Sequence, residues 1–338
     1  MNDKLILVGD SDIIHIGSHL LDSAKELGLD VRFCDVKDAF AGPRWLSRIN
    51  WYLRDHRPNR LCYFSNIVLK VCQEFQPKWL LSVGLAPVNS SALAAIVKLG
   101  IKRLNYLTDD PWNPAHRARF FFSALPHYDR IFSTRLSNLD ELKNKCRGNV
   151  SYLPFAYNPN LHFPQKPDEK EGREYECDVA FVGGADRDRV GYIYRLIHAG
   201  FRVSLYGGYW DRFSETRKYA RGHIGPETMR KAVSAAKINL CLVRRANQDG
   251  NSMRTFEIPA MGGCMLAEDT AEHKKIFGGE GEAVAYFKNI DEMIQKARFL
   301  IANETERNRL AEKCHNLIVG GGNTYKDRFL TILKSVES

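Results

Sequence analysis

The sequence lacks the features that identify membrane-spanning, secreted and metal-binding proteins. No apolar run approaches the roughly 20 residues that are needed to cross a bilayer. The opening residues, MNDKLILVG, enter a short apolar segment without the charged and long apolar regions of a signal peptide. The 10 histidines form no HExxH or HxH pattern. We therefore predict a cytoplasmic protein that needs no metal.

Paired cysteines and common nucleotide-binding signatures are also missing. The 8 cysteines include no CxxC pair, and Cys34 and Cys241 lie inside apolar runs, where cysteine behaves as a small hydrophobic residue. We expect free thiols in a reducing compartment rather than disulfides or a zinc site. Neither GxGxxG nor the P-loop pattern GxxxxGK occurs, which disfavours a redox dinucleotide enzyme. No cofactor is therefore predicted.

The composition is ordinary for a globular protein apart from its charge. The 338 residues are 44% hydrophobic and 26% charged, and they are enough for two domains with separate cores. The net charge is +9 and the isoelectric point about 9.1. This excess favours an anionic partner such as phosphate, a membrane surface or nucleic acid, although it also serves solubility alone.

Short apolar runs alternate with amphipathic segments along most of the chain. Residues 4–9 predict a strand, residues 19–27 a helix that Gly28 ends, and residues 31–34 a second strand. The same alternation continues with strands at 78–83, 103–107, 130–133 and 150–155, and then at 177–182, 203–206, 238–243, 264–267 and 283–287. The pattern predicts an α/β protein with mostly parallel sheets covered on both faces.

The alternation lapses between residues 158 and 174, where three prolines lie among polar residues. We therefore predict a Rossmann-like domain at 1–157, a linker at 158–174, a second Rossmann-like domain at 175–320 and a C-terminal helix at 321–338. Two such domains would face each other across a cleft, and the C-terminal helix is expected to pack back on the first.

One polar stretch between two apolar runs is the strongest candidate for a ligand site. Asp249, Arg254 and Glu257 follow the run that ends at Val243 and precede the run that begins at Cys264. We expect all three at the carboxyl edge of a parallel sheet, where open α/β sheets bind ligands. A carboxylate accepts hydrogen bonds from a ribose diol, and arginine grips phosphate through two parallel hydrogen bonds.

Several segments together resemble the CgeB-like, group-1-type glycosyltransferases. The resemblance covers nearly the whole chain and implies the GT-B architecture of two facing Rossmann-like domains. The segments that carry it are Asp109–Pro111, Leu153–Ala156, Asp178–Gly183, Leu205–Gly207 with Trp210, Ala236–Leu240, Arg254–Gly262, and Tyr325 with Arg328.

The resemblance also implies roles for residues of the second domain. In the retaining enzymes of this group, the second Glu of a Glu-x7-Glu motif holds the nucleotide ribose, and Glu257 matches it. The first position is Asp249, one methylene shorter. In the same group of enzymes, basic residues after the first strand of the second domain hold the diphosphate. Arg187 and Arg189 are the nearest match in this sequence. Other residues expected on the nucleotide side are Gly183, Gly184, Tyr206, Gly207, His223 and Gly262.

Each of these assignments has a structural alternative. Glu257 also suits a solvated position at a helix start, and Arg254 either holds phosphate or pairs with Asp249 or Glu257. Arg187 and Arg189 either bind phosphate at a helix N-terminus or pair with neighbouring aspartates. In the first domain, Asp110 is a candidate catalytic base and Asp109 a neighbour on the acceptor side, although Asp-Pro is also a helix-capping device. His15 and Gly17 are candidates for the acceptor or phosphate side.

Residues 44–57 combine six aromatic or aliphatic side chains with four arginines. Trp45, Ile49, Tyr52 and Leu53 share one helical face. Such a helix either lies on an anionic membrane or contacts nucleic-acid phosphate, or it packs through its apolar face and leaves a basic outer face, which is the commoner arrangement.

The hypothesis is a glycosyltransferase that moves a sugar from a nucleotide-diphosphate sugar to a hydroxyl of a glycan, lipid-linked or other acceptor. The resemblance implies a retaining, metal-independent reaction in polysaccharide biosynthesis, with Asp110, Asp249 and Arg254 as catalytic residues. The alternatives are an inverting enzyme with Asp110 as base, a nucleic-acid-modifying glycosyltransferase, which is not favoured, and a non-catalytic nucleotide or glycan binder. Peripheral contact with the inner face of the membrane through residues 44–57 is a further expectation.

Overall fold

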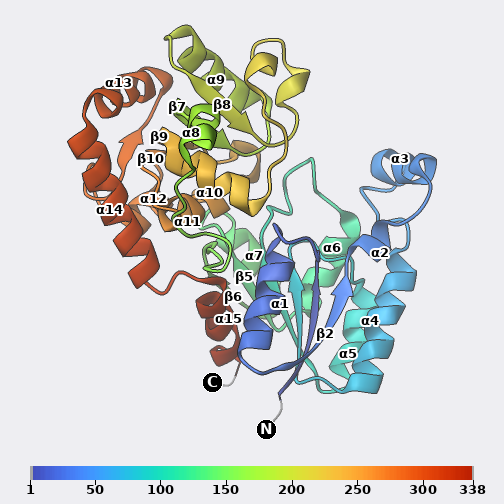
Figure 1. Ribbon diagram of the computed structural model, residues 1–338. Coiled ribbons are helices and arrows are strands. Elements are labelled where there is room, and N and C mark those ends of the chain that lie inside the picture. Colours follow the sequence, from blue (N-terminus) through green and yellow to red (C-terminus); the bar gives the residue numbers. More distant parts are fainter. Residues whose placement is uncertain (1–2, 337–338) are drawn as a thin grey trace. The chain divides into compact units, whose positions relative to one another are not determined.

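The computed structural model describes residues 3–336, and the chain forms two compact units (Figure 1). The first unit runs through Pro154 and adds Ala246–Asp249 and the C-terminal helix from Tyr325 onward. The second unit comprises Phe155–Arg245 and Gly250–Thr324. The boundary therefore falls ahead of the proline-rich segment 158–174, which lies in the second unit and contains the helix α8 (Glu169–Tyr175).

The first unit is built on a parallel sheet of six strands in the order β2-β1-β3-β4-β5-β6. Leu5–Val8 of β1 are fully buried, because helices cover both faces of the sheet. The strands are β1 (Lys4–Gly9), β2 (Asp30–Asp35), β3 (Trp79–Val83), β4 (Lys102–Leu107), β5 (Arg130–Ser133) and β6 (Asn149–Tyr152). The helices are α1 (Ile16–Glu26), α2 (Lys37–Phe40), α3 (Arg44–Leu53), α4 (Leu61–Phe75), α5 (Ser90–Val97), α6 (Arg119–Ala124), α7 (Leu139–Lys145) and α15 (Tyr325–Lys334).

The C-terminal helix α15 packs beside α1 within the first unit (Figure 1). The rings of Tyr325 and His19 stack with their centroids 4.9 Å apart. Arg328 donates from Nε to the carbonyl of Pro154 (3.1 Å), at the residue where the first long segment of this unit ends. The last helix of the chain thus completes the core of its first domain.

The second unit has five parallel strands in the order β11-β10-β9-β7-β8. Its core includes the fully buried residues Val179, Ile193 and Leu205, together with Trp210. The strands are β7 (Cys177–Val182), β8 (Val203–Tyr206), β9 (Ala236–Cys241), β10 (Met265–Glu268) and β11 (Ala285–Phe287). Besides α8, its helices are α9 (Arg187–His198), α10 (Pro226–Ala235), α11 (Met253–Ala260), α12 (Ala271–Phe277), α13 (Ile290–Ala302) and α14 (Glu304–Gly320).

The predicted fold class is confirmed, since both units are parallel sheets flanked by helices. Within residues 3–336, every helix is too short or too polar to cross a membrane.

Candidate functional site

Each sheet has a point where the strand order reverses, and ligands of open α/β sheets bind beside such points at the carboxyl ends of the strands. In the first unit the reversal lies between β1 and β3, and in the second between β7 and β9. A ligand site formed by the predicted residues is therefore expected at these two edges.

At the edge of the second sheet, two pairs of glycines follow adjacent strands. Gly183 donates its amide hydrogen to the carbonyl of Tyr206 (2.7 Å), and Ala185 donates to the carbonyl of Gly208 (2.9 Å). Gly207 has φ +129°, and a Cβ there would lie 2.4 Å from the carbonyl oxygen of Gly183. The two strand ends therefore meet backbone to backbone, and side chains are excluded from the surface they form.

His223 lies beside this glycine surface. A Cβ on Gly208 would come 2.9 Å from Nε2 of His223. The predicted residues Gly183, Gly184, Gly207 and His223 are thus brought together, although they come from three different loops. Tyr206 contributes its backbone only, because its side chain is buried and burial raises the pKa of its hydroxyl to about 12.

The two predicted phosphate ligands on α9 have different environments. Arg189 is buried and donates from Nη1 to the carbonyl of Gly184 (3.1 Å) and from Nη2 to the carbonyl of Leu242 (3.2 Å). It therefore joins the end of β7 to the end of β9. Arg187 is exposed at the first residue of α9, whose capping residue Asp186 accepts the amide hydrogen of Arg189 (2.9 Å). Of the two, Arg187 is the one that presents its guanidinium to solvent.

Helix α11 brings Arg254 and Glu257 to the same edge. Arg254 donates from Nε to the carbonyl of Val182 (3.2 Å), the last residue of β7, and its Nη1 pairs with Glu257 Oε2. The Arg254 side chain remains 29% exposed, whereas that of Glu257 is 1% exposed. The sequence left open whether Arg254 pairs with Asp249 or with Glu257, and the structure pairs it with Glu257.

The other oxygen of Glu257 faces His162, a residue that was not predicted from the sequence. His162 Nε2 lies 3.6 Å from Glu257 Oε1, while His162 Nδ1 accepts the amide hydrogen of Asn158 (3.1 Å). Because Nδ1 is an acceptor, the neutral ring carries its proton on Nε2, toward the carboxylate. Glu257 is thus buried between a cation and an imidazole, and it orients Arg254.

Gly262 lies apart from the other residues predicted to bind the nucleotide. It follows the C-terminal end of α11, with φ +78°, shortly before β10 begins. Because α11 returns from the carboxyl end of β9 to the amino end of β10, Gly262 lies at the opposite edge of the sheet. Its left-handed backbone is the usual way to end a helix.

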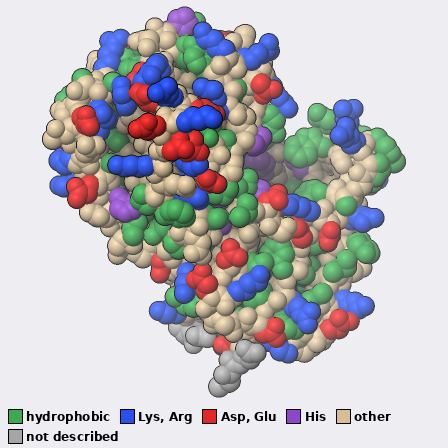
Figure 2. Space-filling view, viewed as in Figure 1, with side chains coloured by type: hydrophobic (Ala, Val, Ile, Leu, Met, Phe, Trp, Pro, Cys, Tyr) green, Lys and Arg blue, Asp and Glu red, His purple; other side chains and the backbone are tan. Residues whose placement is uncertain are grey.

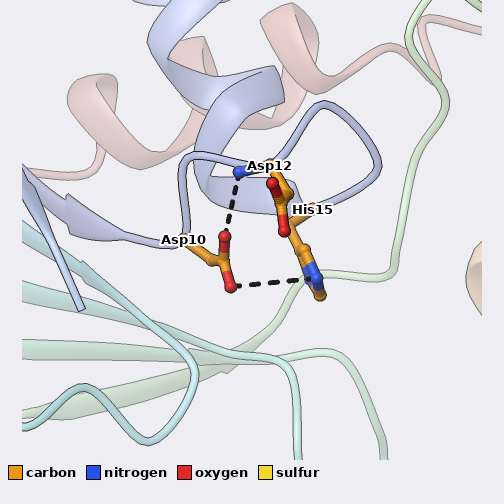
Figure 3. Close-up of side chains that lie close together, drawn as sticks. All are labelled: Asp10, Asp12 and His15. Atoms are coloured by element: carbon orange, nitrogen blue, oxygen red, sulfur yellow. Dashed lines mark hydrogen bonds and ion pairs between the residues drawn. The ribbon is translucent and has the colours of Figure 1, made fainter. Parts of the chain in front are cut away.

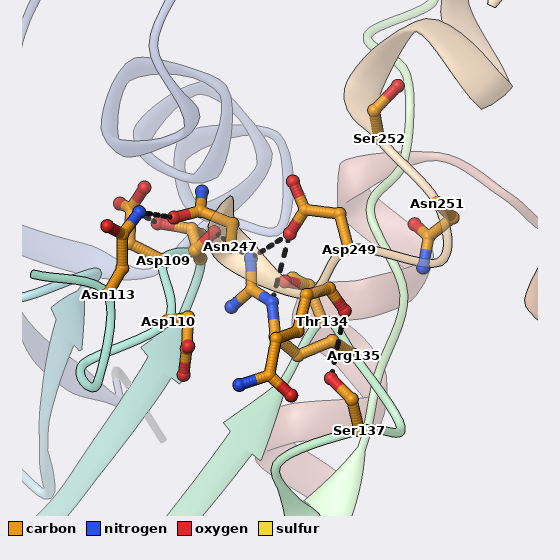
Figure 4. Close-up of polar contacts among 12 residues, drawn as sticks. Asp109, Asp110, Asn113, Thr134, Arg135, Ser137, Asn247, Asp249, Asn251 and Ser252 are labelled. Atoms are coloured by element: carbon orange, nitrogen blue, oxygen red, sulfur yellow. Dashed lines mark hydrogen bonds and ion pairs between the residues drawn. The ribbon is translucent and has the colours of Figure 1, made fainter. Parts of the chain in front are cut away.

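Asp249 belongs to the first unit, which differs from the expectation that it shares one edge with Arg254 and Glu257. Its Oδ1 accepts from Nη2 of Arg135 (2.7 Å) and from Nε (3.0 Å), and Arg135 also donates to the carbonyl of Thr108 (2.8 Å) (Figure 4). The Arg135 side chain is 1% exposed and that of Asp249 10%. The pair is therefore an internal bond of the first unit.

Neighbouring contacts fix the rest of the segment Ala246–Asp249. Asn113 donates from Nδ2 to Asn247 Oδ1, and Ser137 donates to the carbonyl of Gln248 (2.9 Å). Sequence reasoning missed Arg135, Asn113 and Ser137, since nothing in the local pattern ties them to residues more than 100 positions away.

The two aspartates after β4 are unequal in access. Asp110 is 1% exposed and accepts from Nδ2 of Asn138 (3.2 Å). Asp109 is only partly buried, and its Oδ2 accepts from the hydroxyl of Thr108 (3.3 Å). A Cβ on Gly84, at the end of β3, would lie 3.7 Å from that same oxygen. Asp109 therefore lies nearer the order reversal of the first sheet and is more accessible than Asp110.

The loop after β1 places His15 near two aspartates (Figure 3). Asp10 Oδ2 lies 3.8 Å from His15 Nε2, and Lys37 Nζ lies 3.1 Å from Asp10 and 2.9 Å from Asp12. The lysine supplies the positive charge that these carboxylates need, so we assign no metal to them. A Cβ on Gly17 would come 2.6 Å from the carbonyl oxygen of Asp10, which explains the glycine by close backbone packing.

Residues 191–334 match a family model described as glycosyl transferase-like. No curated protein matches the sequence. Similar solved structures include a sucrose-phosphate synthase from Thermosynechococcus elongatus (12% identity, TM-score 0.68) and an alpha,alpha-trehalose 6-phosphate synthase from Burkholderia multivorans (11%, 0.67). The beta-glucosyltransferase of phage T4 is also similar (14%, 0.61).

These alignments span whole chains. They cover 99%, 100% and 99% of this chain, and 98%, 99% and 100% of the three neighbours, in the same order. At such identities the likeness shows the fold, which is GT-B. Residues 191–334 thus match a glycosyl transferase-like family model, and the chain as a whole has the GT-B fold.

Proposed function

We propose that this glycosyltransferase moves a sugar from a nucleotide-diphosphate sugar to an acceptor hydroxyl, and that its second unit binds the nucleotide. The observation that carries the proposal is the glycine surface at the ends of β7 and β8, flanked by Arg187 and Arg254. Glycines let a diphosphate approach the backbone closely, and a helix N-terminus with arginine attracts its charge. One similar structure is described as phage T4 BGT in complex with its UDP-glucose substrate.

In this proposal Arg187 and Arg254 stabilise the negative charge that grows on the departing diphosphate. Arg254 suits the role because Val182 and Glu257 already fix its guanidinium while part of it remains exposed. Preorganised cations of this kind lower the barrier without moving during the reaction. They also supply the positive charge that a metal would otherwise provide, so the proposed reaction is metal-independent.

Arg189, Gly183, Gly184 and Gly207 shape the nucleotide site in this proposal, and His223 borders it. Glu257 acts on the nucleotide through Arg254, and its predicted contact with the ribose requires its buried carboxylate to open toward the ligand. The first unit takes the acceptor, with Asp109, His15 and Gly17 near its carboxyl edge. The buried Asp110 and the partly buried Asp249 support that edge.

We further propose that the reaction retains the anomeric configuration, as the sequence resemblance implies. The alternative is inversion with an aspartate base after β4, for which Asp109 has the better access. A nucleic acid acceptor is a second candidate, since one similar structure is described as the DNA modifying enzyme beta-glucosyltransferase and this chain carries a net charge of +9.

The decisive experiment measures sugar transfer and nucleotide binding together. A panel of nucleotide sugars is incubated with glycan, lipid-linked and duplex DNA acceptors, and NMR of the product gives the anomeric configuration. Calorimetry with nucleoside diphosphates, with and without EDTA, gives the affinity. We expect Arg187→Ala and Arg254→Ala each to weaken binding about tenfold or more, because a hydrogen bond to a charged group contributes about 1.5–3 kcal/mol.

A matched control is Arg298→Ala, which removes an exposed arginine from α13. It should leave nucleotide affinity unchanged. Equal affinity of the wild-type protein and of the Arg187 and Arg254 variants would remove the glycine surface as the nucleotide site. Nucleotide binding without any transfer, hydrolysis included, would favour a non-catalytic binder.

A further inference from the structure

Helix α3 is oriented in the opposite way to an ordinary surface helix. Its apolar residues Trp45, Ile49, Tyr52 and Leu53 are 63%, 39%, 80% and 80% exposed, and Trp51 is 48% exposed. We call these five residues the α3 patch. The helix lies at the margin of the first unit, where hydrophobic and basic side chains gather together (Figures 1 and 2). A packed apolar face with a basic outer face is the commoner arrangement for such a sequence, and these exposures contradict it.

Polar residues attach α3 to the protein. Asn59 donates from Nδ2 to Ser47 Oγ (2.8 Å) and to the carbonyl of Phe40 (3.0 Å), and its Oδ1 accepts from Nδ2 of Asn50 (2.9 Å). Asn50 is the buried residue of the helix. Ser47 and Asn50 lie on the side of the helix opposite to Trp45 and Ile49. The apolar face thus points away from its own domain because a polar network holds the other face.

The loop after α3 fixes this orientation. Asp55 and His56 have φ +54° and +55°, a left-handed conformation that costs a residue with a side chain about 1–2 kcal/mol. Their side chains hold the loop to the start of α6 and to the residues before it, because Asp55 accepts the amide hydrogen of Arg119 (2.7 Å) and His56 Nδ1 contacts the carbonyl of Arg117 (2.5 Å). The exposure of the patch is therefore enforced by specific contacts.

Positive charge surrounds the patch. Arg44, Arg48, Arg54, Arg57 and Arg60 are exposed, and Asp55 is the one acidic residue between positions 41 and 60. A cavity of about 510 Å³ opens beside Leu53 and is lined by the three arginines Arg54, Arg57 and Arg119 and by one carboxylate, that of Asp55. An apolar helix face bordered by arginines and by a basic cavity matches a surface that is apolar within and negatively charged at its boundary.

We propose that the α3 patch docks the first unit onto an anionic membrane surface. Trp45, Tyr52 and Leu53 enter the boundary between headgroups and acyl chains, while the arginines pair with lipid phosphates and the basic cavity receives a phosphate headgroup. Aromatic rings prefer this boundary, and clusters of arginine bind anionic lipids. The aliphatic Ile49 and Leu53 at the centre of the patch favour lipid over nucleic acid, whose bases stack on aromatic rings instead.

The test uses the full-length protein and sedimentation with vesicles. One set contains phosphatidylcholine alone and the other adds phosphatidylglycerol. We expect binding to the anionic vesicles and much less to the neutral ones, with a decrease at high salt. The double variant Arg48→Glu with Tyr52→Ser should bind the anionic vesicles at least about tenfold more weakly. Each basic residue near an anionic surface adds to the binding free energy, and this variant reverses the charge at one of them.

Arg298→Glu with Phe299→Ser is the matched control. It makes the same change of charge and removes one ring from an exposed position on α13, where Phe299 is 57% exposed. It should bind vesicles like the wild type. Because both double variants change exposed residues, neither should alter the folded state, and circular dichroism checks this.

A spectroscopic signature separates insertion from simple electrostatic adsorption. Vesicles with brominated acyl chains should quench tryptophan fluorescence of the wild type, and Trp45→Phe with Trp51→Phe should abolish the quenching. The proposal is overturned if the anionic vesicles bind neither the wild type nor the α13 control variant. It is also overturned if the α3 and α13 double variants bind these vesicles equally. A third contrary outcome is that the protein does not bind vesicles and the substitutions in α3 instead abolish dimer formation in solution or binding to duplex DNA. The proposed nucleotide site lies in the second unit, so the calorimetric test of nucleotide binding is independent of the vesicle experiment.

Discussion

At the scale of single residues, buried arginines hold the backbone of both sheet edges, and exposed ones remain available for a ligand. Arg189 bridges the ends of β7 and β9, and Arg135 anchors Asp249 and Thr108. Both are buried, where a guanidinium needs hydrogen-bond acceptors to offset the loss of water. Arg187 and Arg254 keep exposed surface at the edge of the second sheet. Sequence position alone does not separate these two groups.

Glu257 offers the sharpest test at this scale. Glu257→Ala leaves Arg254 and His162 without their acidic partner, and we expect the second unit to lose about 3–5 kcal/mol of unfolding free energy. Nucleotide affinity should fall about tenfold or more, because Arg254 loses its fixed position. Urea denaturation and calorimetry measure the two effects.

Two mechanisms for Glu257 can be separated with a second nucleotide. If the carboxylate contacts the ribose, a 2′,3′-dideoxynucleotide should bind the wild type more weakly, and Glu257→Ala should no longer distinguish the two nucleotides. If Glu257 acts through Arg254 alone, both nucleotides should lose affinity equally on substitution. Undiminished affinity for both would take Glu257 out of the site.

At the scale of secondary-structure elements, the contact between the ends of β7 and β8 depends on Gly207. Gly207→Ala places a Cβ 2.4 Å from the carbonyl of Gly183 at φ +129°, so one strand end must move. We expect a loss of about 1–3 kcal/mol of unfolding free energy and a clear loss of nucleotide affinity. Calorimetry and thermal unfolding check both.

Gly191→Ala is the matched control for Gly207. Gly191 lies within α9, and a Cβ there meets no atom within 4 Å. Alanine should stabilise the helix by about 0.5–1 kcal/mol and leave nucleotide affinity unchanged. A similar effect of both substitutions would show that the proposed contact between the strand ends has no special role.

His273 of α12 supports the start of α11 through hydrogen bonds. His273 donates from Nδ1 to the carbonyl of Glu268 (2.8 Å), and its Nε2 accepts from the hydroxyl of Thr255 (3.0 Å), which in turn accepts the amide hydrogen of Ser252 (2.9 Å). Burial lowers the pKa of His273 from 6.5 to about 4. The imidazole therefore stays neutral in the folded protein at neutral pH.

This environment gives a pH dependence of known sign. Between pH 6.5 and about pH 4 the unfolded chain binds a proton that folded His273 refuses, so stability is full above pH 6.5 and falls as the pH falls. The loss should amount to about 3 kcal/mol across that window. Urea denaturation at several pH values should show a smaller slope for His273→Gln than for His198→Gln, which alters an exposed ring. Equal slopes would contradict the assignment.

The sequence predicted the elements better than their orientation. Apolar runs located the strands because strands buried on both faces consist of little else, and this part of the prediction is confirmed. Helix α4 was not identified, although Phe64, Val68, Cys72 and Phe75 carry its spacing. The outward face of α3 could not be read, because amphipathic spacing defines an apolar face without saying what covers it. The partner of Asp249 could not be read either, since Arg135 is 114 positions away.

At the scale of the whole molecule, the two units do not correspond to two halves of the chain. The first unit is assembled from three segments, since Ala246–Asp249 and α15 join residues that precede Pro154. Asp249 brings a buried ion pair, and α15 brings the buried side chains of Tyr325, Phe329 and Ile332. The N-terminal segment alone therefore lacks part of its own core.

Removal of the last helix should consequently unfold the domain at the other end of the sequence. A chain that ends at Thr324 exposes the face of α1 that α15 covers. The loss of three large buried side chains amounts to roughly 5–9 kcal/mol at about 1.5–3 kcal/mol each, which is comparable to the whole stability of a domain. Hydrogen–deuterium exchange should become fast throughout residues 3–154. Exchange in 155–245 and 250–324 should remain slow, and nucleotide binding should persist because the proposed site lies in the second unit.

A chain that ends at Lys334 should exchange like the full protein, since α15 is then intact. Protection of residues 3–154 without α15 would show that the N-terminal segment folds by itself, and fast exchange in both units would show that they fold only together.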